Sequence, residues 1–481
     1  MKRRELINLG YGAKDLLPRA LAAAGAAKSA GIKKSALRRR FEALKDHPQS
    51  FFGDRHLGEL ARYIAEKAVP TASTFVPRVK PAPYRSWAVD VDEKAVRQIE
   101  NATRLPVAAR AALMPDAHLG YGLPIGGVLA TRNAVIPYAV GVDIACRMKL
   151  TVLDLPVTAI EGQRDRLAKT LERETRFGIG AEFRDRRDHA VLDDDWTVSP
   201  ITSRLKDKAW RQLGTSGSGN HFVEYGELEV FARSGEGDSG DHGSAAESGL
   251  TLGPGRYLAL LSHSGSRGSG SAVCSHYSKL AMKQRADLPK ELKHLAWLDL
   301  DAEPGREYWD AMNLMGRYAA ANHALIHRHI AKALGADVLL DVENHHNFAW
   351  EEEHDGERLI VHRKGATPAS AGELGIIPGS MASPAFIVRG RGEPVSLRSA
   401  AHGAGRVMSR RKAKSSFTWS ETKKLLAERR VELLSADLDE VPMAYRDIEQ
   451  VMAAQDDLVE TLARFFPRIV KMAPAGERPE D

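Results

Sequence analysis

The pattern of apolar and polar positions changes repeatedly along the chain from Trp87 onward. Short apolar runs predict strands, and a long run with apolar residues every three or four positions predicts a helix over 305–334. The predicted strands include HFVEYGELEV, RYLALLSHS, DVLLDVEN and AFIVRG. They do not alternate with helices at the spacing of a doubly wound sheet. We therefore expect an α+β fold, with mixed sheets and surrounding helices.

The first eighty residues have a different pattern. Two segments rich in Ala, Leu and Lys/Arg, at 13–31 and 33–48, predict helices, and a proline-marked linker follows at 75–84. We expect a basic helical extension over 1–80, a main domain over 85–472 and a charged tail over 473–481. An acidic, Gly/Ser-rich segment at 233–249 is typical of a solvent loop between two strands.

Composition says little about function, but it limits the class of protein and the compartment that we expect. The chain has 481 residues, of which 43% are hydrophobic and 27% charged, which is ordinary for a soluble protein with a large core. A net charge of +6 is mild at this length. Two cysteines, Cys146 and Cys274, are too few for a disulfide framework and fit a reducing compartment. Without a signal peptide or a run of about 18 apolar residues, we expect a cytoplasmic protein with no membrane partner.

Candidate chemistry is concentrated in six blocks at the ends of β-like runs. They are MPDAHLGYGLPIGG (114–127), VGVDIACRM (140–148), GTSGSGNHFVE (214–224), LSHSGSRGSG (261–270), ENHHNFAWEEE (343–353) and IIPGSM with AAHGAGR (376–381 and 400–406). Glycines let the backbone approach a ligand, and histidine, carboxylate and thiolate are usual ligands of divalent metals. Each block alone also fits a capped turn or a buried, hydrogen-bonded histidine. Six blocks in one chain favour a functional site.

In this order the blocks resemble those of the RtcB family of GTP-dependent RNA ligases. The resemblance runs from about residue 113 to about residue 458 and includes GNHFVE, HSGSRG, HHN, VHRKGATPA, IIPGSM, HGAGRVMSR and VPMAYRDIEQVM. It implies one large α+β domain of the family's own type. It also implies an enzyme of tRNA splicing or RNA repair that joins RNA 3'-phosphate or 2',3'-cyclic phosphate ends to 5'-hydroxyl ends. GTP and RNA would be its partners, with an archease-type activating protein as a further one.

By this resemblance the histidine of the HGAGR block, His402, is the catalytic nucleophile, which takes GMP from GTP. A neutral imidazole is a competent nucleophile near pH 7, and small neighbours leave room for a triphosphate. The backbone N–H groups of Gly403, Ala404 and Gly405 can face phosphate oxygens. The local positive potential for GTP and an RNA end would be raised by Arg406, Arg410, Arg411 and Lys412. Without the other blocks, a turn before a basic helix would be the simpler interpretation.

The resemblance also implies two Mn²⁺ ions. Their ligands fall on Asp143, Cys146, His221, His263 and His346. Asp143 and His346 would serve one ion, and Cys146 would bridge both. Ligand chemistry alone would favour Zn²⁺ at least as much, because Mn²⁺ prefers harder oxygen donors than imidazoles and a thiolate.

The resemblance also implies a nucleotide pocket. Its residues would be Asn220, His221, Phe222, Val223, Glu224, His346, Asn347, Pro378, Gly379, Ser380, Met381, His402, Gly403, Ala404, Gly405, Arg406, Tyr445 and Lys471. The Glu224 carboxylate can accept hydrogen bonds from the N1–H and amino edge of guanine and so favour GTP over ATP. The chain departs from the family pattern at Ala145 and Arg147, where the family usually has Gly, and at Ala385 and Ala401, where it usually has Ser.

Asp116, in MPDAHLG, is a second catalytic candidate, which would orient or deprotonate the incoming 5'-hydroxyl; a turn or capping role is the alternative. His323 and His327 in HALIH have the spacing of a zinc-binding helix but lack the neighbouring Glu, which favours a structural role.

Two functions compete with ligation. One is a metal-dependent RNA end-processing hydrolase that has lost productive guanylylation. The other is a non-catalytic RNA-binding protein, and the presence of His402 with all five metal ligands argues against it, because binding alone needs neither.

Overall fold

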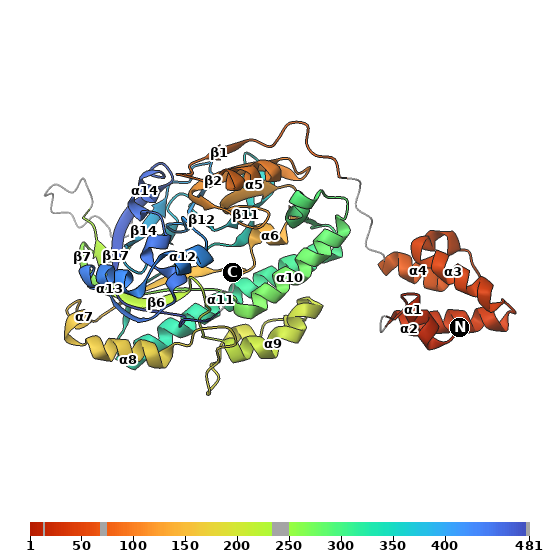
Figure 1. The fold of residues 1–481 in the computed structure, drawn as a ribbon, viewed down its shortest axis with the longest axis horizontal. Helices are drawn as coiled ribbons and strands as arrows, with labels where there is room; N and C mark the ends of the chain where they lie inside the picture. The colour runs from red at the N-terminus through yellow and green to blue at the C-terminus, as the bar shows by residue number, and fades with distance from the viewer. Residues whose placement is uncertain (13–14, 68–74, 233–249, 478–481) are drawn as a thin grey trace. The chain divides into compact units, whose positions relative to one another are not determined.

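The structure is a computed structural model that describes residues 1–12, 15–67, 75–232 and 250–477. The solvent loop expected at 233–249 and the last residues of the expected tail lie outside the described residues. The chain divides into two compact units, Met1–Ser73 and Thr74–Asp481, both traced in Figure 1. Each unit is described by itself.

The N-terminal unit is a set of short helices around its own apolar core. Its elements are α1 (Arg3–Asn8), α2 (Leu16–Ser29), α3 (Lys34–Asp46), the 3₁₀ turn η1 (Pro48–Phe51) and α4 (Gly58–Lys67). Leu37, Phe41 and Leu44, at i, i+4 and i+7 of α3, are all buried. The Tyr11 hydroxyl donates to the carbonyl of Phe41 (2.5 Å), and the two rings meet edge to face. The expected N-terminal helices are confirmed.

The larger unit is built on an eight-stranded sheet. Its order is β13-β14-β17-β6-β7-β5-β9, with β16 beside β17. All neighbours pair antiparallel except β16 and β17, which run parallel. The strands are β5 (Arg147–Leu153), β6 (Phe222–Val230), β7 (Gly255–Ser264), β9 (Val338–His345), β13 (Leu374–Ile377), β14 (Ala385–Gly390), β16 (Glu432–Ser435) and β17 (Val459–Met472).

One face of this sheet encloses side chains that come almost entirely from its own strands. The buried cluster there includes Met148, Leu261, Ile387 and Phe465. The end strands β13 and β9 are joined through a side chain, because the Asn344 Oδ1 accepts from the backbone N–H of Ile376 (3.0 Å). The sheet therefore curves until its first and last strands nearly meet, and this buries its interior without a covering helix.

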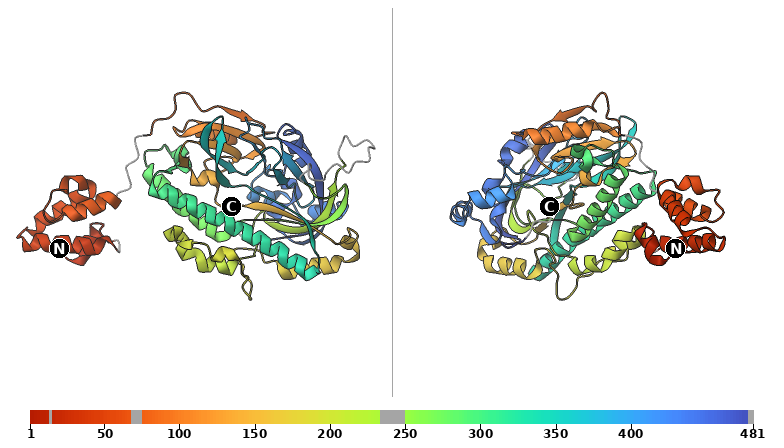
Figure 2. Two further views of the ribbon diagram at one scale, coloured as in Figure 1. Left: turned by 180° about the vertical axis from the view of Figure 1, so that it is seen from behind. Right: turned by 45° about the vertical axis from the view of Figure 1, so that its right-hand side comes forward.

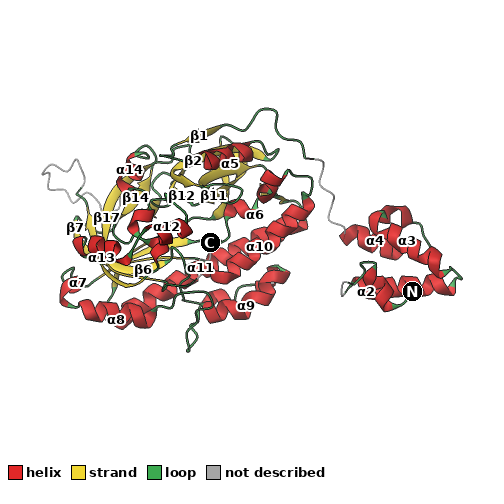
Figure 3. Ribbon diagram, in the orientation of Figure 1, coloured by secondary structure: helices red, strands yellow, loops and turns green. Residues whose placement is uncertain are grey.

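Helices cover the outer face of the same sheet. The helices of the unit are α5 (Glu93–Thr103), α6 (Pro137–Val140), α7 (Ala159–Gly162), α8 (Arg164–Glu174), α9 (Pro200–Gln212), α10 (Arg267–Gln284), α11 (Glu303–Leu334), α12 (Arg410–Ser416), α13 (Trp419–Glu428) and α14 (Ile448–Ala453). Leu260 of β7 packs with Ile326 and Ile330 of α11, whereas its neighbour Leu261 points into the enclosed cluster. Figure 2 shows α10 and α11 side by side, and Figure 3 shows them on one side of the strands.

A second, five-stranded sheet carries the MPDAHLG block. Its order is β1-β2-β3-β11-β10, and β1 alone pairs in parallel. Its strands are β1 (Tyr84–Ser86), β2 (Ala108–His118), β3 (Ile125–Thr131), β10 (Phe348–His354) and β11 (Glu357–Lys364), and two short pairs join β12 (Ala366–Pro368) to β15 (Ser399–Ala401) and β4 (Ala134–Val135) to β8 (Leu298–Asp299). Two mixed sheets with surrounding helices confirm the α+β expectation.

A buried arginine fastens β11 to the segment that leads into His402. Arg363 is fully buried, and its guanidinium donates to both carboxylate oxygens of Glu352 (2.5 and 3.1 Å). The same group donates to the Ser399 hydroxyl (2.8 Å) and the Leu397 carbonyl (2.9 Å). Strand β15 is thus held by a charged group as well as by its short pairing with β12.

We expect Arg363→Met to lower the free energy of unfolding by roughly 3–5 kcal/mol, because it leaves a largely buried carboxylate uncompensated. Arg132 is the control, since its ion pair with Glu357 is far more exposed, and Arg132→Met should cost about 1 kcal/mol or less. Denaturant unfolding of both variants measures the difference. Equal losses would contradict the anchoring role of Arg363.

Candidate active site

Antiparallel pairing brings four of the sequence blocks together where the strands β5, β6, β7 and β9 of the eight-stranded sheet begin or end. Strands β5 and β6 begin at this edge, and β7 and β9 end there. The register pairs His263 with Phe222 and Met148, and it pairs Arg147 with His345. The residues just before β5 and β6, at the end of β7 and just after β9 therefore meet.

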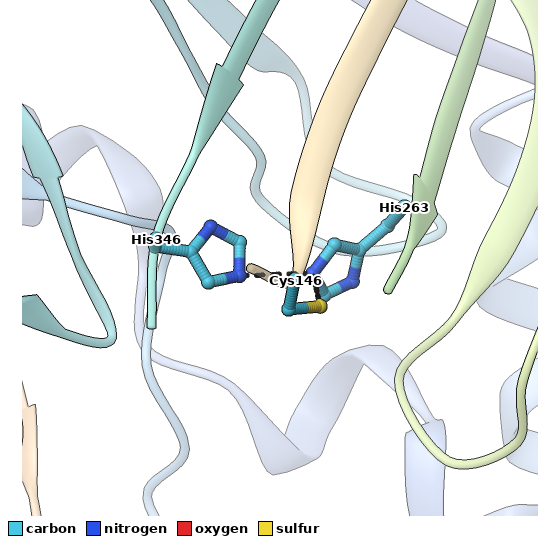
Figure 4. A group of neighbouring side chains, drawn as sticks. All are labelled: Cys146, His263 and His346. Carbon is cyan, nitrogen blue, oxygen red and sulfur yellow. Dashed lines mark hydrogen bonds between the residues drawn. The ribbon is translucent and has the colours of Figure 1, made fainter. Parts of the chain in front are cut away.

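Cys146 lies at the centre of this edge. Its Sγ is 3.0 Å from the Nε2 atom of His263 and 3.4 Å from that of His221. The Nε2 atoms of His263 and His346 are 3.1 Å apart, and Figure 4 shows these two rings and the thiol pointing toward one another. Two candidate ligand groups share the thiol: Cys146 with His263 and His346, and Cys146 with Asp143 and His221. Neither group pairs Asp143 with His346, so the expectation that these two serve one ion stays a prediction.

This donor set fits divalent cations. Burial, together with the neighbouring His221, lowers the pKa of His263 to about 3, and burial lowers that of His346 well below its ordinary value. The Nδ1–H of His263 donates to the carbonyl of Asn220 (3.0 Å), which leaves the lone pair on Nε2, where it faces the cluster. Neutral imidazoles, a thiol and a carboxylate gathered in a buried cluster form a site that can hold metal.

Asp143 completes the cluster as its hard oxygen donor. One oxygen lies 3.0 Å from Nε2 of His221, and the other accepts from the backbone N–H of Ser266 (3.2 Å). Burial acts to raise the pKa of Asp143, but the hydrogen bond and charge of His221 outweigh it, so the pKa lies below its ordinary value. A Cβ atom at Gly265 would lie 2.2 Å from the carboxylate, so only glycine fits beside it.

His402 stands beside this cluster on an independent support. Its Nδ1–H donates to a carboxylate oxygen of Asp116 (2.6 Å), and its backbone N–H donates to the same oxygen (3.2 Å). Asp116 is fully buried, and the ring of His402 lies 4.9 Å from that of His346, centroid to centroid. Because Asp116 occupies Nδ1, the lone pair of the neutral imidazole resides on Nε2.

A cavity of about 1100 Å³ joins His402, the cluster and the remaining blocks. Most of the predicted nucleotide residues line it: Asn220, Phe222, Glu224, His346, Asn347, Pro378, Gly379, Ser380, Met381, His402, Gly403, Ala404, Gly405, Arg406 and Tyr445. Phe222 and Met381 pack with Val470 and Met472 as an apolar wall. Glu224 lines the same cavity, and burial raises its pKa well above the ordinary value.

Three of the predicted nucleotide residues lie outside this lining. His221 belongs to the ligand cluster, and Val223 is fully buried in the core on the helix-covered face. Lys471 alternates with Val470 and Met472 along β17, so its side chain points to the opposite face of the strand. There its ammonium group donates to carbonyls at the end of α8, including that of Leu171 (3.3 Å). The geometry therefore does not bring Lys471 to the nucleotide cavity.

The cavity also contains charged residues that the sequence did not single out. Lys364 is buried, donates to the carbonyl of Tyr121 (2.6 Å) and has its pKa lowered to about 8 by burial. Glu440 accepts from Arg406 (3.1 Å) and also pairs with Arg410. The only sequence signal for Lys364 is its position in the VHRKGATPA block, at the end of an apolar strand.

The second histidine pair is structural, as expected. His323 and His327 are buried, and each lies 2.7 Å from the hydroxyl of Ser262 on β7. They fasten α11 to the sheet beneath the ligand cluster.

Comparison with known proteins agrees with this geometry. The model of the family described as "tRNA-splicing ligase RtcB" matches residues 98–199 and 195–472. The chain is 33% identical over 418 residues to the RNA-splicing ligase RtcB of Escherichia coli strain K12, covering 79% of this chain and 95% of that protein. It is 31% identical over 463 residues to the tRNA-splicing ligase RtcB of Nanoarchaeum equitans, with 80% and 94% covered. The chain belongs to the tRNA-splicing ligase RtcB family.

The positions at which this RtcB-family member departs from the usual pattern have defined surroundings. Ala145 has φ of 56°, a conformation that glycine adopts more readily, which accounts for the usual residue there. Arg147 points away from the cavity, because it alternates with Cys146; its guanidinium donates to Glu343 (3.0 Å) and to the carbonyl of Gly316 (3.2 Å).

Among the described residues, no helix has the length and apolar character needed to cross a membrane.

We expect Cys146→Ala to lose bound divalent metal from both ligand groups, because both groups use its Sγ atom. His221→Ala should keep the ion of the His263–His346 group. Cys274→Ala is the control, since Cys274 is the other buried cysteine and lies in the hydrophobic core. Elemental analysis of the loaded, desalted proteins gives the metal content. Full metal content in Cys146→Ala would contradict the shared site.

Proposed function

We propose that this RNA ligase of the RtcB family joins RNA 3'-phosphate ends to 5'-hydroxyl ends with GTP, through a GMP adduct on His402. A 2',3'-cyclic phosphate would first be hydrolysed to the 3'-phosphate. The observation that carries the proposal is the hydrogen bond between His402 Nδ1 and the buried Asp116, next to a cluster that can hold metal. It fixes the tautomer with the nucleophilic lone pair on Nε2.

The proposed reaction has three phosphoryl-transfer steps. In the first, Nε2 of His402 attacks the α-phosphorus of GTP, the P–N bond forms and pyrophosphate leaves. An oxygen of the RNA 3'-phosphate then attacks the same phosphorus, the P–N bond breaks and GMP is transferred to the RNA. Finally the 5'-hydroxyl attacks the RNA phosphorus, loses its proton and expels GMP, which leaves a 3',5'-phosphodiester.

Asp116 acts in this scheme as a positioning residue for the nucleophile. Its carboxylate already accepts two hydrogen bonds from His402, which makes this role better supported than orientation of the 5'-hydroxyl. It also stabilises positive charge on the imidazole as the P–N bond forms.

The phosphates would be bound by the cationic residues of the cavity. Lys364 and Arg406 line it, and Arg406 is fixed by Glu440, so its guanidinium is oriented in advance. Two divalent cations, Mn²⁺ by family resemblance, would be held by Asp143, Cys146, His221, His263 and His346 and would neutralise phosphate charge as pyrophosphate leaves. The cavity, at about 1100 Å³, is at the upper end of the roughly 300–1,000 Å³ of typical small-molecule sites or above it, which leaves room for an RNA end.

Base recognition would fall to Glu224 beside the apolar wall. Guanine presents N1–H and an amino group, and both would hydrogen-bond to the Glu224 carboxylate and so favour its ionised form against the burial that raises its pKa, whereas adenine has no donor at N1. An archease-type activator and a role in tRNA splicing or RNA repair belong to the same proposal.

Incubation with Mn²⁺ and α-labelled GTP should give a covalent label that survives alkali and is released by acid, as a phosphoramidate does. His402→Ala should abolish the label. Asp116→Asn should slow labelling by roughly 10²–10⁴-fold, because the amide no longer enforces the reactive tautomer.

Two further measurements separate the role of His402 as nucleophile from the role of the metal-binding cluster: the amount of bound metal, and the joining of an RNA that already carries GMP. His402→Ala should still bind metal and should join an RNA whose 3' end already carries GMP, since only the adduct-forming step is lost. No label in the wild-type protein with any divalent metal would favour the end-processing hydrolase instead.

GTP affinity should fall as the pH rises above about 8. The ammonium of Lys364 is charged below its pKa of about 8 and neutral above it, so binding weakens by up to about tenfold per pH unit until the pKa of the bound state is reached. Lys364→Gln should bind weakly and lose this dependence. Titration calorimetry from pH 7 to 9.5 measures it.

Lys471→Gln is the matched control. Burial also lowers the pKa of Lys471 to about 8, but that side chain lies outside the cavity. The wild-type pH dependence should survive this change. If Lys471→Gln abolished it and Lys364→Gln did not, Lys364 would not be the phosphate-binding group.

A further inference from the structure

The positive charge of the chain is concentrated outside the part that matches the RtcB family. Residues 1–73 contain fifteen Lys and Arg against seven Asp and Glu, a net charge of +8. The whole chain carries +6, so the remaining residues sum to −2. The family model begins only at residue 98. The excess charge therefore belongs to a unit that folds around its own core and is not needed to build the active site.

Helix periodicity gathers these charges along α3. Lys34, Arg38 and Lys45 occur at i, i+4 and i+11, so they share one face of the helix. The side chains of Lys34 and Arg38 are 70% and 68% exposed. With a rise of about 1.5 Å per residue this face extends for roughly 16 Å, enough to meet several phosphates of a nucleic-acid strand.

The N-terminal segment 2–10 contacts α3 and adds further exposed charges beside this face. Glu5 forms an ion pair with Lys34, and Nζ of Lys45 lies against Gly10, so the segment meets α3 at two points. Lys2, Arg3 and Arg4 precede Glu5 directly and are exposed. We call the resulting patch the α1–α3 basic surface; it consists of Lys2, Arg3, Arg4, Lys34, Arg38 and Lys45.

Carboxylates of the unit do not cancel this surface. Glu59 pairs with Arg19 at 3.6 Å, and Asp54 pairs with Arg40, so both carboxylates have cationic partners outside the patch. Arg40 is thus engaged in holding the fold, and it is excluded from the surface although it is adjacent to Arg38 and Arg39 in sequence. Among the side chains that the structure describes in this unit, Glu5 and Glu42 form ion pairs with members of the patch.

We propose that the α1–α3 basic surface binds the phosphate backbone of the RNA substrate, without reading its sequence. The inference rests on the proposed ligase function, which supplies a polyanionic substrate to a main unit with almost no net charge of its own. Large exposed apolar residues in the described part of the unit, Ile7, Leu21 and Phe52, are only 36–44% exposed and do not form the wide apolar face of a protein-docking site. Phosphate contacts of this kind position a nucleic acid and add affinity for every sequence alike.

The test is RNA binding by the full chain, measured by fluorescence anisotropy with a labelled 5'-hydroxyl stem-loop RNA at several salt concentrations and without GTP or metal. The variant is Arg3→Gln, Arg4→Gln, Arg38→Gln and Lys45→Gln together, since glutamine keeps helix propensity. It should bind RNA more weakly, and its log–log salt slope should be shallower by roughly 3, because each lost phosphate contact removes about 0.7–0.9.

The matched control removes four exposed lysines from helices α8, α9 and α10 of the larger unit: Lys169, Lys206, Lys279 and Lys283, each changed to Gln. It should keep the wild-type slope. A second variant, Arg3→Lys, Arg4→Lys, Arg38→Lys and Lys45→Arg, retains the charge and should also keep it. An unchanged slope in the glutamine variant, or an equal loss in the control, would overturn the proposal.

GTP labelling of His402 separates this inference from the ligase function. All variants should label like the wild type, because labelling needs only GTP and metal. A wild-type protein that is not labelled but loses its salt slope in the glutamine variant would leave the RNA surface standing and overturn the ligase mechanism. Normal labelling of His402 with an unchanged salt slope in the glutamine variant would leave the ligase mechanism standing and overturn the RNA-binding surface.

Discussion

Burial of a thiol, three imidazoles and a carboxylate at one edge of the sheet is the constraint on which the rest of the structure depends. Polar groups of this kind are costly in a core unless each finds a partner. The antiparallel register of β6, β7, β5 and β9 brings neighbouring members of this set within 3.0–3.4 Å. Helix α11 packs on the outer face of the curved sheet behind this cluster. Gly265 leaves space for the Asp143 carboxylate, so the groups stay packed together.

His402 is fixed by a separate set of contacts, and this separation matters for the chemistry. The cluster is built on the eight-stranded sheet, whereas Asp116 ends a strand of the five-stranded sheet. His402 follows the short strand β15, which Arg363 holds from β11. The His402 and His346 rings meet between these two supports, so the packing of the sheets sets the distance between the proposed nucleophile and the candidate ligand cluster.

The positively charged side chains of the cavity and those of the N-terminal unit differ in how they are held. The cationic groups Lys364 and Arg406 of the cavity are buried or partly buried and are held by a carbonyl or a carboxylate, Lys364 by Tyr121 and Arg406 by Glu440, so both groups are oriented in advance. The N-terminal unit instead carries many exposed cations on short helices. Oriented charges suit discrimination between phosphate positions, and exposed charges suit long-range, salt-sensitive attraction of a polyanion.

The sequence by itself determined the fold class, the N-terminal helices, the family and the blocks that line the cavity. Apolar runs set strands and helices because periodicity is local, and motifs such as GNHFVE and HGAGR are contiguous. Only the tertiary structure decided which candidate ligands lie together, since the approach of His346 to His263 depends on strand register. Strand alternation likewise removed Lys471 from the cavity and turned Arg147 away from it, and the contact of β15 with β2 joined Asp116 to His402. These outcomes follow from contacts between segments far apart in the chain, which no local pattern encodes.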